Sequence, residues 1–200
     1  MITNPSEKDE IYLANVAKIG GSTNNIQYIE NVLPEEEHKI LLDYIKITDS
    51  WKEQPWKALT IQSEDLPEEI IQILNKVFEF VYKKSVDLYD VEINPFHKSA
   101  LHLVKFVKGF YLVPHVDTLS SEGNHIASVY YINDDYTGGE INFPEHNLEI
   151  KPKPNSLIIF PGNENYLHEV REILDSNRYS SAMWLQFTGS TFNKKAEWYN

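Results

Sequence analysis

His115 and Asp117 form a His-x-Asp triplet in the stretch Tyr111–Thr118, which reads YLVPHVDT. An apolar run ends at this point, and side chains two residues apart on a strand project to the same side. An imidazole and a carboxylate that project together offer two ligands to a metal that accepts nitrogen and oxygen donors. The triplet is also common as the polar end of an ordinary strand, so the metal interpretation needs a third ligand.

His168 is the best candidate for that third ligand. It follows the apolar run Leu157–Phe160 and a Pro161-Gly162 turn, and it begins another short segment of strand-like sequence. His125 opens an apolar run and His146 lies in a turn, so we interpret both as surface or turn histidines. His38, His97 and His102 lie upstream and are further candidates, so the residues alone set His168 apart without completing the ligand set.

Arg178 opens an otherwise apolar strand that continues to Phe187. Its guanidinium either lies at a strand edge and faces water, or turns inward to meet an anion, because an unpaired buried charge is costly.

The composition restricts the chemistry that the protein can perform. The chain has no cysteine, which excludes disulfides, cysteine-based zinc sites, iron–sulfur clusters and thiol nucleophiles. The 18 Lys and Arg against 30 Asp and Glu give a formal charge of -12. Nucleic acids and anionic membranes are poor partners for such a surface, whereas a neutral or basic peptide is electrostatically acceptable. We see neither a secretory signal nor an apolar run of about 18 residues, so we expect a soluble, cytoplasmic protein.

The N-terminal half reads as helical support for a single domain. Residues 1–25 are polar and end in a glycine turn, which predicts a tail, and residues 26–200 form one domain. Helical spacing of apolar residues predicts one helix over 34–47 and a second from about 70 to 84, within a supporting part that extends to about residue 97.

From about residue 98 to 188 the pattern changes to short strands separated by turns. These segments are rich in Val, Ile, Phe and Tyr, and they cover residues 100–107, 110–114, 126–132, 140–143, 157–160 and 180–187. Closely spaced strands of this kind indicate an antiparallel sandwich or barrel. We predict a mainly β fold with N-terminal helices.

The order of motifs resembles the iron(II)- and 2-oxoglutarate-dependent oxygenases, and within them the prolyl hydroxylase group. The motifs are His115-x-Asp117, Gly138-Gly139-Glu140, a Pro-x-Ser-Leu-x-x-Phe strand ending at Phe160, His168-Glu-Val and Arg178-Tyr-Ser. The resemblance covers residues 98–188. It implies a double-stranded β-helix, the jelly-roll sandwich shared with cupins.

The resemblance also implies a cofactor and a reaction. His115, Asp117 and His168 would bind Fe(II), and Arg178 would bind the far carboxylate of the cosubstrate 2-oxoglutarate. Tyr131 matches a family tyrosine that joins this ion pair, and Trp184, on the same strand face as Arg178, matches an aromatic that lines the same pocket. The alternative for each of the two is a core aromatic. Dioxygen would be the oxidant, with ascorbate as a candidate reductant. The implied reaction is hydroxylation of a prolyl residue in a peptide or protein, coupled to decarboxylation of 2-oxoglutarate to succinate.

The sequence departs from the family in one respect and leaves two alternatives open. The family often has a tyrosine directed at the cosubstrate where this chain has Phe106. The same chemistry on a free amino acid or another small molecule remains an alternative, as does a non-catalytic cupin-like binding module. The loop 118–124 beside the predicted metal site is a candidate substrate lid.

Overall fold

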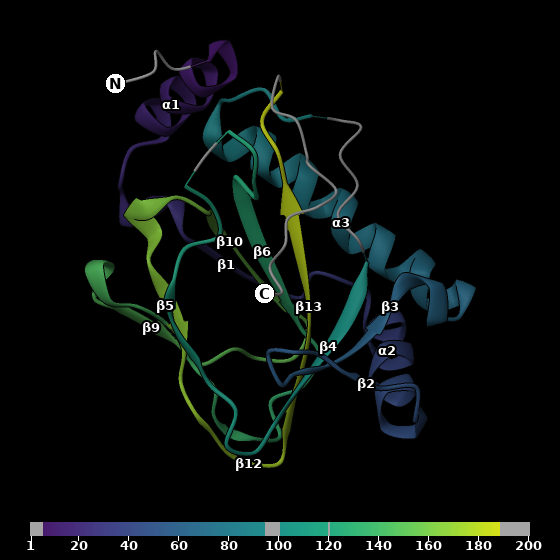
Figure 1. Cartoon of the computed structure of the whole chain (residues 1–200). Coiled ribbons are helices and arrows are strands. Elements are labelled where there is room, and N and C mark those ends of the chain that lie inside the picture. Colours follow the sequence, from purple (N-terminus) through teal and green to yellow (C-terminus); the bar gives the residue numbers. More distant parts are fainter. Residues whose placement is uncertain (1–5, 95–100, 120, 189–200) are drawn as a thin grey trace.

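The protein is a sandwich of two antiparallel sheets with helices on one side. The computed structural model describes residues 6–94, 101–119 and 121–188. The larger sheet has the strand order β1-β10-β6-β13-β4-β3-β2 (Figure 1). Its strands, in chain order, are β1 (Gln27–Glu30), β2 (Lys52–Glu53), β3 (Leu59–Gln62), β4 (His102–Val107), β6 (Ile126–Tyr131), β10 (Ser156–Pro161) and β13 (Asn177–Leu185).

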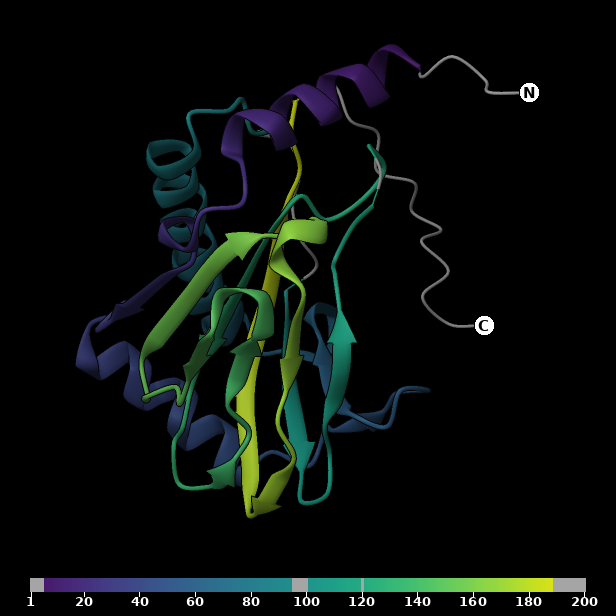
Figure 2. The same ribbon diagram turned by 90° about the vertical axis from the view of Figure 1, so that its left-hand side faces the viewer.

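The second sheet lies in front of the first (Figure 2) and has the order β5-β11-β8-β9. Its strands are β5 (Leu112–His115), β8 (Ile141–Phe143), β9 (Leu148–Ile150) and β11 (His168–Val170). A two-stranded ribbon of β7 (Thr137–Gly138) and β12 (Ile173–Asp175) closes one end of the sandwich. The predicted mainly β architecture is confirmed.

Two helices cover the outer face of the larger sheet. They are α2 (Glu35–Ile47) and α3 (Glu68–Tyr89), and both predicted helices are thereby confirmed. Buried residues of α3 recur every three or four positions, as in Leu74, Val77 and Val81, which places one apolar stripe against the sheet. These side chains belong to one hydrophobic cluster with residues of β3, β4, β6, β10 and β13. The opposite face of the larger sheet is therefore left to face the second sheet.

Two smaller clusters fill the space between the sheets. One joins Tyr131 and Phe160 of the larger sheet to Phe143 of the second sheet. The other, nearer the β7–β12 ribbon, contains Phe106 and Ile173. Neighbouring Gly138 and Gly139 form the predicted turn, with φ of +73° and +68°. A Cβ at Gly138 would lie 1.9 Å from the carbonyl oxygen of Glu172, so only glycine fits there.

The N-terminal segment departs from the prediction of a tail. Residues Glu7–Ile19 form the helix α1, which begins at a capping box in which Ser6 and Asp9 each bond to the other's backbone. Tyr12 and Val16 of this helix are buried in the main cluster. The sequence did not predict this helix because only a narrow face of α1 is buried, so the segment is mostly polar and lacks a clear helical spacing of apolar residues.

The region from 26 to 97, predicted as helical support, also contributes strands. β1 pairs with β10, and β3 pairs with β4, so both are parts of the larger sheet. Four 3₁₀ turns complete the described elements: Thr23–Asn25, Ser63–Asp65, Pro144–His146 and Glu164–Tyr166. The boundary of a single domain at residue 26 stays a prediction. Within the described residues, no helix is both long enough and apolar enough to cross a membrane.

Candidate metal centre

His115, Asp117 and His168 meet at one end of the sandwich. Each offers a ligand atom, and these three atoms all lie within 4.8 Å of one another. Nε2 of His168 is 3.9 Å from Oδ2 of Asp117, and the two imidazole ring centroids are 4.3 Å apart. Two imidazoles and one carboxylate at this spacing can hold one octahedral metal ion by a single face.

Strand pairing brings the two histidines together. β5 and β11 are antiparallel neighbours, and His115 is the direct partner of His168 in their register. A bulge follows, after which Leu112 is opposite Val170. The bulge keeps Leu112 and His115 on the inward side and leaves Val113 and Pro114 exposed.

Asp117 lies beyond the end of β5, in a loop, and not on the strand itself. Its backbone N–H donates to the carbonyl oxygen of Gly162 at 2.9 Å, as does that of Thr118 at 2.9 Å. Gly162 permits this close approach, because a Cβ there would lie 2.2 Å from the carbonyl oxygen of Asn124 and 3.0 Å from Cβ of Asp117. The Pro161-Gly162 turn is therefore what positions the predicted carboxylate ligand.

Both histidines are oriented for metal binding. Nδ1 of His115 lies 2.8 Å from the carbonyl oxygen of Val113, and Nδ1 of His168 lies 3.0 Å from that of Tyr166. A carbonyl oxygen can only accept, so Nδ1 carries the proton in each ring. Nε2 is then left with its lone pair, which is the tautomer that binds a metal.

Burial controls the charges of this cluster. It raises the pKa of Asp117 to about 6, although His115 and a hydrogen bond from the Trp184 side chain act in the opposite direction. Burial and the neighbouring His115 lower the pKa of His168 to about 3. The rings of Phe160 and Phe143 lie 4.6 Å and 5.7 Å from that of His168. A neutral imidazole in a dry aromatic wall is suited to donate its lone pair.

Arg178 lies inside the sandwich, with 2 % of its surface exposed. On β13 it is the direct partner of Phe106 on β4, and its Cζ lies 5.1 Å and 4.9 Å from the rings of Phe106 and Tyr131. Within the described chain, neither its Nε nor its Nη1 has a hydrogen-bond partner. A guanidinium that is buried without an anion is costly, so the site is suited to an anionic ligand.

Two tyrosine hydroxyls, those of Tyr131 and Tyr136, are also buried without a hydrogen-bond partner within the described chain. Burial raises the pKa of Tyr131, and the nearby guanidinium of Arg178 opposes the shift. Both hydroxyls are therefore protonated at neutral pH and can donate to a carboxylate beside the guanidinium.

Lys151 is a nearby cation that sequence reasoning missed. Its Nζ lies 3.8 Å above the Tyr136 ring and donates to the backbone carbonyls of Tyr136 and Gly138, at 2.9 Å and 2.7 Å. Burial, aided by Arg178, lowers its pKa. The surrounding Lys-Pro-Lys-Pro sequence reads as a turn, so no local signal separates Lys151 from a solvated lysine.

Trp184 lies beside the predicted metal ligand Asp117. Its side chain donates a hydrogen bond to Asp117 and stacks on His102, with ring centroids 5.8 Å apart and planes at 12°. Arg178 is six positions away on the same strand. The structure thus places Trp184 beside a predicted metal ligand, whereas the sequence suggested the pocket around the guanidinium.

His125 and His146 lie outside the cluster. His146 is in a 3₁₀ turn, as predicted, where Nε2 contacts the carbonyl oxygen of Asn165 at 2.7 Å. His125, interpreted from the sequence as a surface or turn histidine, is instead 1 % exposed; its ring stacks on that of Phe187 and makes a tilted contact with that of Tyr12. The correction follows from α1, which covers His125.

Comparisons with known proteins agree with this geometry. The family model described as the 2OG-Fe(II) oxygenase superfamily matches residues 101–186, which contain all three predicted ligands and Arg178. No protein with a curated description matches the sequence.

Solved structures of prolyl hydroxylases have a similar fold. One is a prolyl-4-hydroxylase from Pseudomonas putida, with a TM-score of 0.69 and 15% identity over 91% of this chain and 100% of that one. A prolyl hydroxylase from Trichoplax adhaerens has a TM-score of 0.68 and 16% identity over 90% and 91%. The viral collagen prolyl hydroxylase of Paramecium Bursaria Chlorella virus-1 has a TM-score of 0.65 and 15% identity over 83% and 97%. The chain has the double-stranded β-helix fold of these enzymes, and its residues 101–186 match the model of the 2OG-Fe(II) oxygenase superfamily.

Proposed function

We propose that the protein is an Fe(II)- and 2-oxoglutarate-dependent dioxygenase that hydroxylates prolyl residues in a peptide or protein. One observation carries the proposal: the same sandwich contains a His-Asp-His cluster, in which His168 is buried and the other two are half-buried, and an inward arginine whose Nε and Nη1 have no partner within the described residues. The cluster fits a divalent metal, and the arginine fits a carboxylate.

His115, Asp117 and His168 would hold the metal ion. Bound Fe(II) supplies the redox chemistry by which dioxygen converts 2-oxoglutarate to succinate and carbon dioxide and hydroxylates a C–H bond. The protein's own part is to hold and orient. The backbone carbonyls of Val113 and Tyr166 fix the imidazole tautomers, and the aromatic rings around His168 exclude water.

Arg178 would bind the far carboxylate of 2-oxoglutarate, and the Tyr131 hydroxyl would donate to the same group. A bidentate guanidinium–carboxylate pair fixes both position and orientation, so it would hold the other end of the diacid at the metal. Phe106 lies over the same guanidinium and contributes no hydroxyl. The number of donors to the cosubstrate is therefore reduced by one relative to the family pattern.

The similar structures favour a prolyl substrate. The Trichoplax protein was solved with a peptide fragment of the oxygen degradation domain of hypoxia inducible factor, and the viral protein with 2-oxoglutarate. A formal charge of -12 favours neutral or basic peptides. A cytoplasmic location is part of the same proposal, and fractionation of expressing cells would test it.

The experiment is a succinate-release assay with Fe(II) and 2-oxoglutarate, run with a panel of proline-containing peptides and with free amino acids. We expect succinate release to rise with at least one peptide, and mass spectrometry to find one added oxygen atom on a proline. The His168→Ala variant is the inactive control. Product on a free amino acid alone would favour a small-molecule substrate, and wild-type protein that releases no succinate would favour a binding module.

A further inference from the structure

The helix α1 contacts the loop that carries Asp117. It lies across the end of the sandwich at which β5 finishes (Figure 2). Oγ of Ser121, in the loop between Asp117 and β6, donates a hydrogen bond of 2.6 Å to Oδ1 of Asp9. Ser121 is 4 % exposed. This hydrogen bond, the largest cause of the shift, lowers the pKa of Asp9, so its carboxylate is charged at neutral pH.

A second contact joins α1 to the far end of the same loop. The ring of Tyr12 lies 5.1 Å from that of His125, which stacks on Phe187 at 4.5 Å. Nδ1 of His125 also accepts a hydrogen bond from the backbone N–H of Phe187 at 2.8 Å. The imidazole is thereby fixed between Tyr12 and Phe187, which also fixes the position of the His125 backbone.

The backbone of His125 leads directly to Asp117. The N–H of Gly162 donates to the carbonyl oxygen of His125 at 2.9 Å, and the carbonyl oxygen of Gly162 accepts from Asp117 and Thr118. Gly162 thus connects His125, which is covered by α1, to Asp117 through two backbone hydrogen bonds. The path from Tyr12 to Asp117 consists of the tilted ring contact between Tyr12 and His125 and of backbone hydrogen bonds of 2.9 Å.

The loop between these contacts has little free space. A Cβ at Gly123 would lie 2.0 Å from Oγ1 of Thr118, so the end of the loop packs directly on its beginning. The side chain of Gln186 donates to the carbonyl oxygen of Gly123 at 3.1 Å. A shift of Ser121 would therefore be transmitted to Thr118, which is adjacent to Asp117. The loop 118–124, suggested by the sequence as a lid, is fastened at Ser121.

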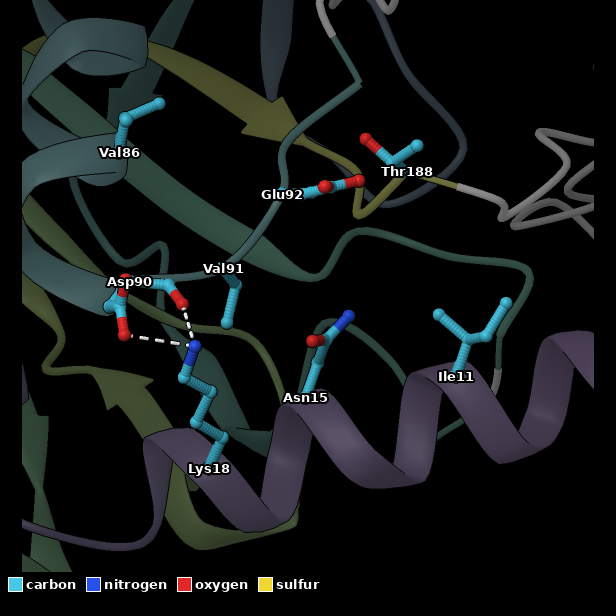
Figure 3. A pocket seen from close by; sticks show the side chains of 8 residues that line it. All are labelled: Ile11, Asn15, Lys18, Val86, Asp90, Val91, Glu92 and Thr188. Atoms are coloured by element: carbon cyan, nitrogen blue, oxygen red, sulfur yellow. Dashed lines mark hydrogen bonds and ion pairs between the residues drawn. The ribbon is translucent and has the colours of Figure 1, made fainter.

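The other end of α1 is fixed as well. Nζ of Lys18 forms an ion pair of 2.9 Å with Oδ2 of Asp90, just after the end of α3 (Figure 3). Both side chains are largely exposed, so this pair contributes little energy. The contacts of Tyr12 and Asp9 are therefore the ones that connect the helix to the loop.

We propose that α1 is a positioning element of the metal centre, in which Asp9 and Tyr12 act through Ser121 and His125 to hold the carboxylate of Asp117 at the metal position. This inference rests on the metal site of the proposed function. None of the four residues is itself one of the predicted metal ligands. They position a ligand without binding the metal. Loss of a residue that contacts a ligand directly typically lowers metal affinity about 10–100-fold, and we expect a smaller loss for residues that act through an intermediate residue.

Asp9 provides a matched pair of variants. Its Oδ1 accepts from Ser121 and its Oδ2 accepts from the hydroxyl of Ser6 at 2.7 Å. Ser121→Ala removes the bond to the loop and keeps the helix cap, whereas Ser6→Ala removes the cap and keeps the bond to the loop. The readouts are the dissociation constant of Mn(II), followed by electron paramagnetic resonance, and the thermal midpoint of the metal-free protein.

We expect Ser121→Ala to raise the dissociation constant of Mn(II) about 3- to 10-fold, while Ser6→Ala lowers the thermal midpoint and leaves Mn(II) affinity unchanged. Tyr12→Leu, which opens the ring stack, should also weaken Mn(II) binding, and circular dichroism would verify that each variant is folded. Equal Mn(II) affinities for Ser121→Ala and the wild type would overturn the inference, and so would equal losses in both serine variants.

Mn(II) binding separates this inference from the proposed function, because the assay contains neither 2-oxoglutarate nor a peptide. A wild-type protein that binds Mn(II) but hydroxylates no peptide would leave the inference standing and remove the prolyl substrate. A wild-type protein that binds no Mn(II) would overturn the metal site and the inference together.

Discussion

His115 and His168 are direct partners across β5 and β11, and their ring centroids lie 4.3 Å apart. Since each Nδ1 is occupied by a backbone carbonyl, both Nε2 atoms are left for a shared ion. We expect His115→Ala and His168→Ala each to abolish Mn(II) binding and succinate release, because two protein ligands hold such an ion poorly. His146→Ala, outside the cluster, is the control and should retain both activities. Metal binding that survived in both alanine variants would contradict the assignment.

Arg178 should determine the affinity for 2-oxoglutarate. The loss of a bidentate, charge-assisted pair costs about 1.5–3 kcal/mol, so Arg178→Ala should raise the KM for 2-oxoglutarate about 10- to 100-fold. Mn(II) affinity should not change. Arg171, which is half-exposed and paired with Glu149 and Glu169, provides the control Arg171→Ala. The assignment fails if the two variants have the same KM.

Tyr131→Phe distinguishes a cosubstrate contact from a core aromatic. The hydroxyl is buried and has no hydrogen-bond partner among the described residues, so its removal should leave the thermal midpoint unchanged or raise it slightly. If the hydroxyl donates to the bound carboxylate, the KM for 2-oxoglutarate should rise about 2- to 10-fold. A variant with unchanged KM would identify Tyr131 as a packing residue.

The protonation equilibrium of Asp117, taken by itself, should make the folded metal-free protein more stable in mild acid than at neutral pH. Burial raises its pKa in the folded state from 3.8 to about 6. Protonation therefore favours the folded state, and this contribution is fully present below about pH 4 and is lost as the pH rises through 6. The lowered pKa of His168 has the opposite sign, since its contribution is lost as the pH falls from 6.5 toward 3.

Asp117→Asn isolates the carboxylate term, because His168 is present in both proteins. We expect the metal-free variant to be more stable than the wild type at about pH 7.5, by on the order of 1–3 kcal/mol. The difference should shrink toward about pH 5, as Asp117 becomes protonated. Urea denaturation in the presence of a chelator measures the free energy of unfolding of both proteins at the two pH values. A variant less stable than the wild type at the higher pH would show that burial of the charged carboxylate does not destabilise the folded state.

The pattern of the sequence was sufficient for the helices α2 and α3 and for most strands of the sandwich. It also singled out His115, Asp117 and His168, whose ligand atoms lie within 4.8 Å of one another, and their binding of a metal stays a prediction. Each of these depends on local information: the spacing of apolar residues, turn-forming dipeptides and residue types that bind metals. The family resemblance added the order of the motifs, and the superfamily match agrees with it. The roles of Arg178, Tyr131 and Trp184 stay predictions.

The helix α1 was only partly predictable from the sequence. Its start has a readable signal, since Ser6 and Asp9 form a capping box, but its apolar face is too narrow to stand out in a polar segment. The short strands β1 and β3 carry still less signal. They are strands because β10 and β4 offer free edges to them, and that information is not local.

The sequence by itself determined which side chains are available: a cysteine-free set of nitrogen and oxygen ligands, one arginine at the head of an apolar strand, and the alternation that buries one face of each strand. Only the tertiary structure decided that Asp117 reaches the histidines from a loop held by Gly162, that Trp184 donates to Asp117, and that His125 is buried under α1. The physical reason is that these contacts join segments far apart in the chain. Their geometry follows from strand register and backbone hydrogen bonds, which no short stretch of sequence contains.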